Sequence, residues 1–440
     1  MFHVKHFDET RRTSAKEPNM KATFDKQKLL AALTPAAGIS QSKNTMASVD
    51  GLLFECPPDP RLGEVEDPNP NFCRISAFDL EKGLRTSVEC KIGETGMFVI
   101  DTVKILQIIR AMPDGSITIE IDDKGRVHIA GGQSSFDITA APGEEFPSMP
   151  QFVGEQTYRI PQYIIKQLVS RTVYAVAQND TRAAFNGAFF KIRNGELTVV
   201  GCDGFRLAAA KCPLPNGGAD SEILIPGKFL GELTKMLRDT EDEVTMMVGR
   251  KHIIFKIDTI HFFTRMLDVE YIDYERLFPD TYRTEVYVSA ADLRSAVERA
   301  SIVTEYKLGG AGKSPIRLDI GDNAITLSAV SAGGSVRERV PAAVGGADIS
   351  IGFDGRYLLD ALKATPTNCE TLRIRLNESL KGAVIEPAGG TTFKDARPDE
   401  TVFSERKFDA AADYANKNSE DEEKDPSSFI SFVMPTRMNK

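Results

Sequence analysis

The hydrophobic positions of the chain follow one pattern three times. In ATFDKQKLLAAL (22–33), YRIPQYIIKQLV (158–169) and VYVSAADLRSAV (286–297), a strand-like apolar residue precedes a residue suited to start a helix. Asp and Ser cap helices, and Pro fits the first helical turn. Each stretch therefore predicts a strand that leads into an amphipathic helix.

A second strand-to-helix unit recurs with nearly the same period. It reads FVIDTVKILQIIRAM (98–112), EILIPGKFLGELTKML (222–237) and ISIGFDGRYLLDALKA (349–364). Together the two units predict six helices, at residues 25–37, 101–112, 161–176, 227–239, 290–303 and 354–364.

Strand-like runs separate these helices. SITIEID, RVHIA, ELTVV and TLRIRL alternate apolar and polar residues, which is typical of half-buried strands. Asn194-Gly195 lies between two such runs and predicts a hairpin. Because each repeat holds two helices and many strands, we predict an α+β fold. The repeats predict three homologous domains, at 20–153, 154–279 and 280–440.

Two segments fall outside the repeats. Residues 1–19 predict a disordered N-terminal extension, either a tag or the product of an upstream start. Residues 388–428 form an insertion in the third domain, and from 394 to 425 they hold eleven acidic and six basic residues. Such a composition predicts a solvated, disordered acidic loop, after which the apolar run FISFVMP resumes.

Charge is divided unevenly along the chain. The 440 residues include 54 Lys or Arg and 63 Asp or Glu, a net charge of −9. The six predicted helices hold thirteen basic and eight acidic residues, which leaves −14 for the remainder. This balance argues against a uniformly basic nucleic-acid binder, whereas a basic surface on an acidic body is compatible with these numbers. Basic helix faces that serve only solubility would give the same pattern.

Neither a membrane span nor a secretory signal is predicted. No apolar run approaches the roughly 20 residues that cross a bilayer, and the polar N-terminus lacks an apolar signal core. The six cysteines show no zinc-ligand spacing, and a disulfide framework would be unusual in a chain of this length. This composition favours a reduced, cytoplasmic setting.

Motifs for catalysis are weak. LGGAGKSP (308–315) resembles a phosphate-binding P-loop, but Lys307 stands where the first Gly is required, and the segment follows a helix and precedes a strand. A Gly-rich connection is the favoured interpretation, with a P-loop NTPase as the alternative. The histidines show no metal-ligand spacing, and no nucleophile is paired with a base. We therefore predict a binding protein without metal or cofactor rather than an enzyme.

One stretch suggests a binding surface. GCDGFRLAAA (201–210) places Arg206 after a turn and within a small apolar strand. A plain hairpin with a surface arginine would explain it. The functional interpretation is the rim of an apolar pocket with a cationic tip.

Several longer motifs occur in a fixed order: MKATFDKQKLL, AFDLEKGLRTSVE, RAMPDG, SSFDITAAPGEEFPSM, NDTRAAFNGAFF, CDGFRLA and the terminal VMPTRM. With them the chain resembles the bacterial sliding clamp family, the beta subunits of DNA polymerase III, over nearly all of residues 20–387 and 429–438. The resemblance implies the DNA-clamp fold: three clamp domains, each with two helices plus antiparallel sheets. It also implies a homodimer that closes a ring around double-stranded DNA.

The resemblance gives the basic helices a role. Inside a ring they would face phosphates without reading bases. The residues implied to face DNA are Lys26, Lys28, Lys43, Lys104, Arg110, Lys166, Arg171, Lys228, Lys235, Arg238, Arg294, Arg299, Arg356 and Lys363. A separate ATP-driven clamp loader places the ring, so this chain would be a non-catalytic subunit that needs no P-loop.

The resemblance also implies a pocket for partner peptides. Matching residue by residue gives Arg182, Phe185, Cys202, Gly204, Phe205, Arg206, Leu207, Ile272, Arg276, Leu277, Leu380, Gly382, Phe432, Val433, Met434, Pro435, Thr436, Arg437 and Met438. The chain departs from the family at Ile272, usually Pro, and at Thr436, usually Met. The dimer contact would pair Phe136 and Ile138 with Ile302 and Val303.

The implied partners are DNA, a second copy, the polymerase III catalytic subunit and the clamp loader. Other proteins with a clamp-binding motif would follow: translesion polymerases, mismatch-repair proteins and ligase. The implied location is the cytoplasm, at the nucleoid and replisome. A divergent clamp that serves a phage-type or specialised replisome is the alternative within the family.

Overall fold

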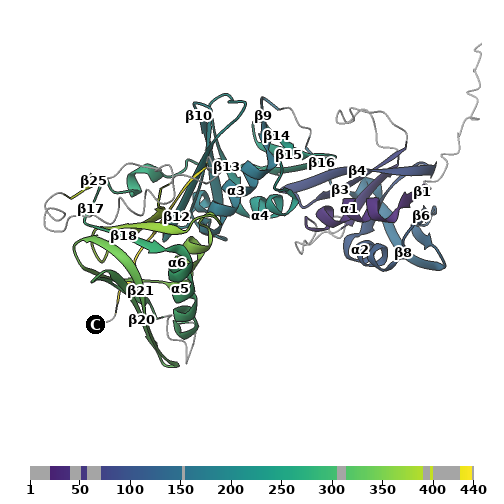
Figure 1. Cartoon of the computed structure of the whole chain (residues 1–440). Helices are drawn as coiled ribbons and strands as arrows, with labels where there is room; N and C mark the ends of the chain where they lie inside the picture. The colour runs from purple at the N-terminus through teal and green to yellow at the C-terminus, as the bar shows by residue number, and fades with distance from the viewer. Residues whose placement is uncertain are drawn as a thin grey trace, which may run out of the picture. The chain divides into compact units, whose positions relative to one another are not determined.

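The computed structural model of the chain describes residues 20–39, 51–56, 71–150, 154–304, 314–389, 397–399 and 427–438. The predictions for residues 1–19, Lys43, residues 308–313 and most of 388–428 lie outside the described residues. The chain divides into two compact units (Figure 1): Met1–Val153 with Ile254–Phe263, and Gly154–Ile253 with Thr264–Lys440.

The first repeat forms most of the first unit. Its elements are β1 (Met20–Asp25), α1 (Lys26–Ala37), β2 (Gly51–Cys56), β3 (Phe72–Phe78), β4 (Lys82–Glu94), β5 (Gly96–Asp101), α2 (Thr102–Ala111), β6 (Ser116–Ile121), β7 (Arg126–Gly131), β8 (Ser134–Pro142) and a 3-10 turn, η2 (Gly143–Glu145). The strands pair in the order β1-β6-β7-β8-β5-β2-β3-β4, and β1 also pairs with β4. Eight antiparallel strands thus form a closed cycle of neighbours, and α1 packs beside α2.

The second repeat has the same two-helix plan. Its elements are β9 (Gln156–Pro161), α3 (Gln162–Thr172), η3 (Val173–Ala175), η4 (Ala183–Asn186), β10 (Gly187–Arg193), β11 (Glu196–Cys202), β12 (Arg206–Pro213), β13 (Ser221–Pro226), α4 (Gly227–Met236), β14 (Glu243–Val248), β15 (His252–Ile257) and β16 (Ile260–Arg265). Helix α3 packs beside α4.

The third repeat follows a short 3-10 turn, η5 (Tyr274–Leu277). Its elements are β17 (Thr281–Tyr282), β18 (Thr284–Ser289), α5 (Ala290–Thr304), β19 (Ile316–Gly321), β20 (Ala324–Ser331), β21 (Gly334–Gly346), β22 (Ile349–Phe353), α6 (Gly355–Lys363), β23 (Thr371–Leu376), β24 (Ala383–Pro387), β25 (Arg397–Pro398) and β26 (Ser428–Val433). Helix α5 packs beside α6.

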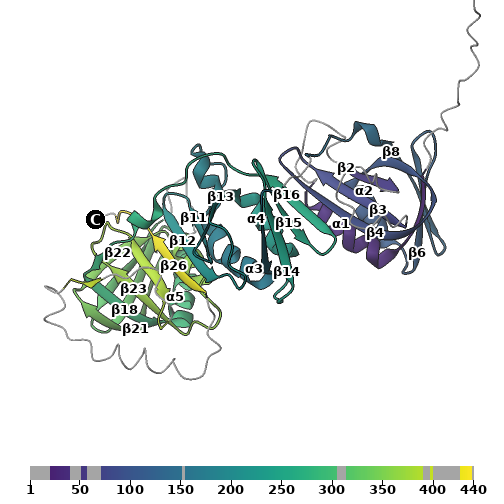
Figure 2. The same ribbon diagram turned by 90° about the horizontal axis from the view of Figure 1, so that it is seen from above.

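One sheet runs through the second and third repeats. Its strand order is β13-β10-β11-β12-β26-β24-β23-β18-β21-β20-β19-β22. The last strand, β26, lies between β12 of the second repeat and β24 of the third, antiparallel to both. Figure 2 shows β26 beside β12. The segment after the acidic insertion therefore joins two repeats into one backbone hydrogen-bonded layer.

The six predicted helices are confirmed; five are shorter than predicted, and α5 extends one residue further, to Thr304. Asp25 and Asp354 cap α1 and α6 by accepting hydrogen bonds from backbone N–H groups of the first turn. The third predicted helix ends at Thr172 instead of residue 176 and continues as a single 3-10 turn. The fourth ends at Met236 because Leu237 is extended and the N–H of Arg238 donates to Gln162 Oε1 at 3.0 Å.

The predicted hairpin is also confirmed. Asn194 and Gly195 have φ values of 52° and 75° and connect β10 to β11, where Arg193 pairs with Glu196. Two positive φ values in a two-residue loop fit a type I′ turn, which Asn-Gly favours.

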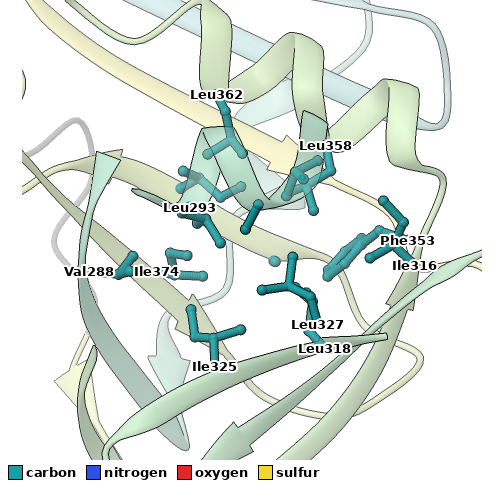
Figure 3. Packing of buried hydrophobic residues seen from close by; sticks show 14 of the residues in the cluster. Val288, Leu293, Ile316, Leu318, Ile325, Leu327, Phe353, Leu358, Leu362 and Ile374 are labelled. Carbon is teal, nitrogen blue, oxygen red and sulfur yellow. The ribbon is translucent and has the colours of Figure 1, made fainter. Parts of the chain in front are cut away.

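The core of the third repeat lies between its helices and its sheet. Figure 3 shows Leu293, Leu358 and Leu362 from α5 and α6 facing side chains of the strands, among them Phe353 and Ile374. Leu293, Leu358 and Phe353 are each at most 1% exposed. The helical spacing read from the sequence thus places one apolar face of each helix on the sheet. The domain boundaries at 153/154 and 279/280 stay predictions.

Candidate functional site

An apolar cluster covers one face of the sheet where the second and third repeats meet. Tyr274 and Phe278, on and after η5, pack onto residues of four strands, and the Phe278 ring meets the Phe432 ring edge-on at 6.1 Å. Tyr271 stacks on Phe189 with ring centroids 4.9 Å apart. The buried members are Phe185, Val200, Cys202, Leu207, Ala209, Tyr274, Phe278, Val384, Ile430 and Phe432.

Four exposed apolar side chains lie next to this cluster in the sequence. Leu277 is 42% exposed, Leu380 65%, Met434 38% and Phe205 57%. Their neighbours converge on one ring: Phe278 packs on Phe432, and a Cβ added at Gly382 would meet Phe432 Cζ at 2.2 Å. Glycine is required at position 382 by this close approach. Large exposed apolar side chains beside a buried cluster form a surface suited to an apolar ligand.

A tight turn carries Phe205. The N–H groups of Phe205 and Arg206 each donate to Asp203 Oδ1 at 2.9 Å, and Gly204 adopts a φ of 88°. This turn ends β11 and starts β12. The sequence GCDGFRLAAA is therefore a hairpin, and its tip presents Phe205 to solvent.

Arg182 lies on the other side of the turn. Its guanidinium sits 4.1 Å from the centroid of the Phe185 ring and donates to both carboxylate oxygens of Asp180 at 3.0 Å. These hydrogen bonds lower the pKa of Asp180 to about 2. Arg182 is thus a fixed, exposed cation at the edge of the cluster.

The expectation that Arg206 forms a cationic rim is wrong. Arg206 is 7% exposed, and its Nε donates to Asp203 Oδ2 at 3.0 Å while Nη1 donates to Asp360 Oδ2 at 2.6 Å. The guanidinium also lies 4.7 Å from the Tyr357 ring centroid and 5.2 Å from that of Tyr174. Two carboxylates and two rings enclose the charge, so it is directed into the molecule.

Leu207 and Val433 also differ from the predicted pocket walls. Both are fully buried, and Val433 belongs to the core of the third repeat. Leu207 and Val433 are buried side chains of strands β12 and β26, which carry the exposed apolar surface, so they do not line it. Ile272 is half-buried against the cluster, and Arg276 is exposed, with Nε 2.7 Å from Asp273 Oδ2.

The end of the described chain is held in place. The N–H of Met434 donates to the carbonyl oxygen of Phe205, and the N–H of Thr436 donates to that of Gly352, both at 2.8 Å. A Cβ at Gly352 would meet Met438 Cγ at 2.6 Å. Pro435 is half-buried and Arg437 exposed. Residues 434–438 therefore lie along the turn that carries Phe205 and along β22.

A charged cleft of about 960 Å³ lies beside this surface and shares Arg276 and Phe278 with it. Its other walls come from the same sheet face, including Lys191, Glu196 and Lys211. Lys191 pairs with Glu275, and Lys211 with Glu196. The sheet face is thus apolar near Phe432 and ion-paired further along.

The four residues of the predicted dimer contact lie in two different units. On β8, Phe136 is 39% exposed and Ile138 half-buried. At the end of α5, Ile302 is 73% exposed and Val303 half-buried. Helix α5 buries Leu293, Ala296, Val297 and Ala300, so the 73% exposed Ile302 has no packing role among the residues that the structure describes.

Most of the residues predicted to face DNA are exposed. Those on described helices with exposed side chains are Lys28, Lys104, Arg110, Lys228, Lys235, Arg294, Arg299, Arg356 and Lys363, and Arg238, just after α4, is exposed as well. Lys26 and Lys166 are half-buried and pair with Asp114 and Asp239.

Arg171 corrects the prediction of an exposed cation on α3. It is 8% exposed, and its Nη1 donates to Ser427 Oγ. Ser427 directly precedes β26, so the chain that returns from the insertion lies over this arginine.

Sequence reasoning missed three residues of the site: Tyr174, Tyr357 and Asp360. Tyr357 and Asp360 are three apart on a predicted helix and therefore share a face. No local pattern indicates that this face meets Arg206, which is 154 residues from Asp360. Within the described ranges, no cluster of three or more His, Cys, Asp or Glu could hold a metal ion, and no helix is long and apolar enough to cross a membrane.

Family models match almost the whole described chain. Those of the N-terminal, central and C-terminal domains of the DNA polymerase III beta subunit match residues 20–150, 159–273 and 275–397. The beta sliding clamp of Staphylococcus aureus strain Mu50 is 28% identical over 300 residues, which cover 68% of this chain and 78% of that protein. The Staphylococcus epidermidis clamp is 27% identical over 299 residues, with the same coverage of 68% and 78%.

Solved structures share the fold. The DNA polymerase sliding clamp from Bacillus subtilis has a TM-score of 0.78 and 22% identity, covering 96% of this chain and 100% of that one. The sliding clamp from Pseudomonas aeruginosa bound to griselimycin has a TM-score of 0.76 and 23% identity, with the same coverage of 96% and 100%.

Proposed function

The chain belongs to the DNA polymerase III beta subunit family, the beta sliding clamps, and on this premise we propose that two copies close a ring around duplex DNA and tether partner proteins through the surface at Phe432. It is a sliding clamp with three α+β clamp domains, and its family is a non-catalytic processivity subunit of the polymerase. The finer points proposed here are the ring contact, the residues toward DNA and the partners.

Charge supports a DNA-facing set of helices. The six helix ranges predicted from the sequence carry a net +5 and the rest of the chain −14. Cations in contact with phosphates attract DNA without reading its sequence, whereas acidic surfaces repel it. Among the described residues, Lys104, Arg110 and Arg294 have exposed side chains and form no ion pair, so they are available to phosphates.

Exposure supports the dimer contact. A two-fold assembly repeats one self-complementary contact, so each subunit must present two matching apolar patches. Phe136 with Ile138 would supply one patch, and Ile302 with Val303 the other. Burial of Ile302 would remove the most exposed large apolar side chain described in the chain.

The observation that carries the tether is that exposed apolar side chains lie close in sequence to Phe432 itself and to residues that pack against it, Phe278 and Gly382. A short peptide with one or two large apolar residues would cover Leu277, Leu380 and Met434, and main-chain and rim contacts would fix its direction. The partners are then the polymerase III catalytic subunit, the clamp loader, translesion polymerases, mismatch-repair proteins and ligase, in the cytoplasm at the nucleoid.

The test is fluorescence anisotropy with a labelled peptide of the type Gln-Leu-x-Leu-Phe. Leu277→Ser with Leu380→Ser should weaken binding at least about tenfold, equal to about 1.4 kcal/mol. Val103→Ser, a matched control on α2 that is 57% exposed, should leave the affinity unchanged. Equal binding by both variants would place the peptide elsewhere, and failure of the unaltered protein to bind would reject the tether.

A further inference from the structure

An ion pair connects the second repeat to the third beneath the exposed Phe205. Arg206 starts β12, and Asp360 lies in α6. Arg206 Nη1 lies 2.6 Å from Asp360 Oδ2, and the side chains are 8% and 29% exposed. Charge-assisted bonds of this length between partly buried groups have well-defined geometry. The pair therefore fixes where α6 meets the end of β12.

Aromatic rings extend this contact to the surface. The Phe205 ring stacks on the Tyr357 ring at 6.0 Å with an interplanar angle of 23°, and Phe205 remains 57% exposed. The Arg206 guanidinium lies 4.7 Å from the Tyr357 centroid and 5.2 Å from that of Tyr174. Guanidinium groups stack favourably on aromatic faces. One contact chain thus runs from half-buried Tyr174 through Arg206 and Tyr357 to Phe205.

The two aspartates hold Arg206 in different ways. Asp203 also accepts the N–H groups of Phe205 and Arg206, so it is required for the turn itself. Among the described contacts, the Asp360 side chain accepts no backbone N–H. Its Oδ2 lies 2.6 Å from Arg206 Nη1 and 3.9 Å from Arg356 Nε. Loss of the Asp360 charge would leave Arg206 with Asp203 as counter-ion, so the buried cation stays paired while its connection to α6 weakens.

We propose that Asp360 is a positioning residue for partner binding: through Arg206 it holds the Phe205–Tyr357 ring pair as a rigid apolar edge of the peptide surface. This inference rests on the proposed tether. Asp360 itself does not touch the peptide. When the ring pair is already rigid, peptide binding does not have to immobilise these side chains. When the ring pair is mobile, binding must order it, and this entropy cost lowers the affinity even though no contact is lost.

The absence of tryptophan from the chain provides a direct reporter. In full-length protein carrying Phe205→Trp, the indole would be the single tryptophan and would report the position of the ring at 205. Adding Asp360→Asn should shift its emission to longer wavelength and raise its quenching by acrylamide, because the ring spends more time in water. Asp319→Asn is the control, since Asp319 pairs with Arg317 in the same repeat, is 39% exposed against 29% for Asp360, and should change neither signal.

Affinity for the Gln-Leu-x-Leu-Phe peptide completes the test. Asp360→Asn should weaken binding about tenfold, while dimer mass and melting temperature stay close to those of the unaltered protein. Asp360→Glu, which keeps the carboxylate, should restore most of the affinity. Unchanged affinity or an unchanged tryptophan signal in Asp360→Asn would overturn the proposal. So would a loss of affinity that tracks a fall in melting temperature and is not restored by Glu. If the unaltered protein does not bind this peptide, the proposed tethering function is rejected, and the role of Asp360 with it.

Discussion

The N–H of Thr436 donates a 2.8 Å hydrogen bond to the carbonyl oxygen of Gly352, which holds the C-terminal segment 434–438 against β22. Met438 packs so closely on Gly352 that an added Cβ would lie 2.6 Å from its Cγ. A chain end rich in Met, Pro and Arg would ordinarily fray. Its attachment here places Met434 beside the exposed apolar surface.

Deletion of residues 434–440 should weaken peptide binding at least about tenfold, or about 1.4 kcal/mol. The deletion removes exposed Met434 and its bond to the Phe205 carbonyl, but leaves the fully buried Val433 in the core. Anisotropy would measure affinity, and native mass spectrometry with thermal melting would follow the fold. Gly352→Val, which crowds Met438, should act in the same direction. If the variant that lacks residues 434–440 binds the peptide as tightly as the full chain, this role is refuted. If that variant unfolds, the segment belongs to the core.

Ile302→Asp with Val303→Arg should convert the dimer to a folded monomer. Burial of charges without partners at both copies of the contact would cost several kcal/mol. Val103→Asp is the control, because it adds a charge at an exposed position on α2. Sedimentation velocity should show a monomer for the double variant and a dimer for the control. A dimer that persists at micromolar concentration in the double variant would mean that the contact is misplaced.

Two glycine-to-alanine changes should have opposite effects on unfolding of the second unit. A methyl group at Gly382 would lie 2.2 Å from the Phe432 ring, and overpacking of this kind costs about 1–3 kcal/mol. Gly231 in α4 has no atom within 4 Å of an added Cβ, so alanine there should stabilise by up to about 1 kcal/mol. Urea denaturation of both variants measures the difference. Equal stabilities would contradict the packing at Phe432.

The helices and hairpins were predictable because their signals are local. Asp25 and Asp354 sit where a cap is expected, and Asn194-Gly195 defines its own turn. The partners of β26 were not predictable, since a strand's alternation indicates a buried face but not which strands lie beside it. Arg206 was predicted to be exposed for the same reason. An arginine in an apolar strand is predicted to be exposed, because its sequence does not show that the distant Asp360 and Tyr357 surround it.

Arg171 shows the same limit on a helix. Helical spacing correctly leaves Lys228, Lys235 and Arg238 open to solvent. It cannot show that the chain returns over α3 at Ser427 and buries one of the predicted DNA-facing cations. Periodicity gives the face of a helix, and tertiary contacts decide which part of that face stays open.

Cys202 should resist alkylation at neutral pH. Burial raises the pKa of its thiol to about 11. About one thiol in a thousand is then ionised at pH 8, and the thiolate is the reactive form. The folded state disfavours ionisation of this thiol. Its contribution to the free energy of unfolding is therefore fully present below the ordinary thiol pKa of about 8.5 and is lost as pH rises toward 11.

Iodoacetamide labelling followed by peptide mass mapping measures these rates. Cys369, the half-buried cysteine, should react first, and Cys369→Ser should remove the fast phase. Labelling of Cys202 should speed up about tenfold per pH unit between 8 and 10. Rapid labelling of Cys202 at pH 7 would contradict its burial beneath the peptide surface.

The central claim is that the chain holds DNA by enclosing it, and retention on circular DNA tests this most directly. The protein would be placed on a nicked circular plasmid by an ATP-driven clamp loader, washed at about 1 M salt, where charges are screened beyond about 3 Å, and then followed after the plasmid is linearised. We predict that the protein stays on the circle through the wash and leaves within minutes once free ends exist. Equal retention on circular and linear DNA, or loss from the circle during the wash, would contradict a closed ring.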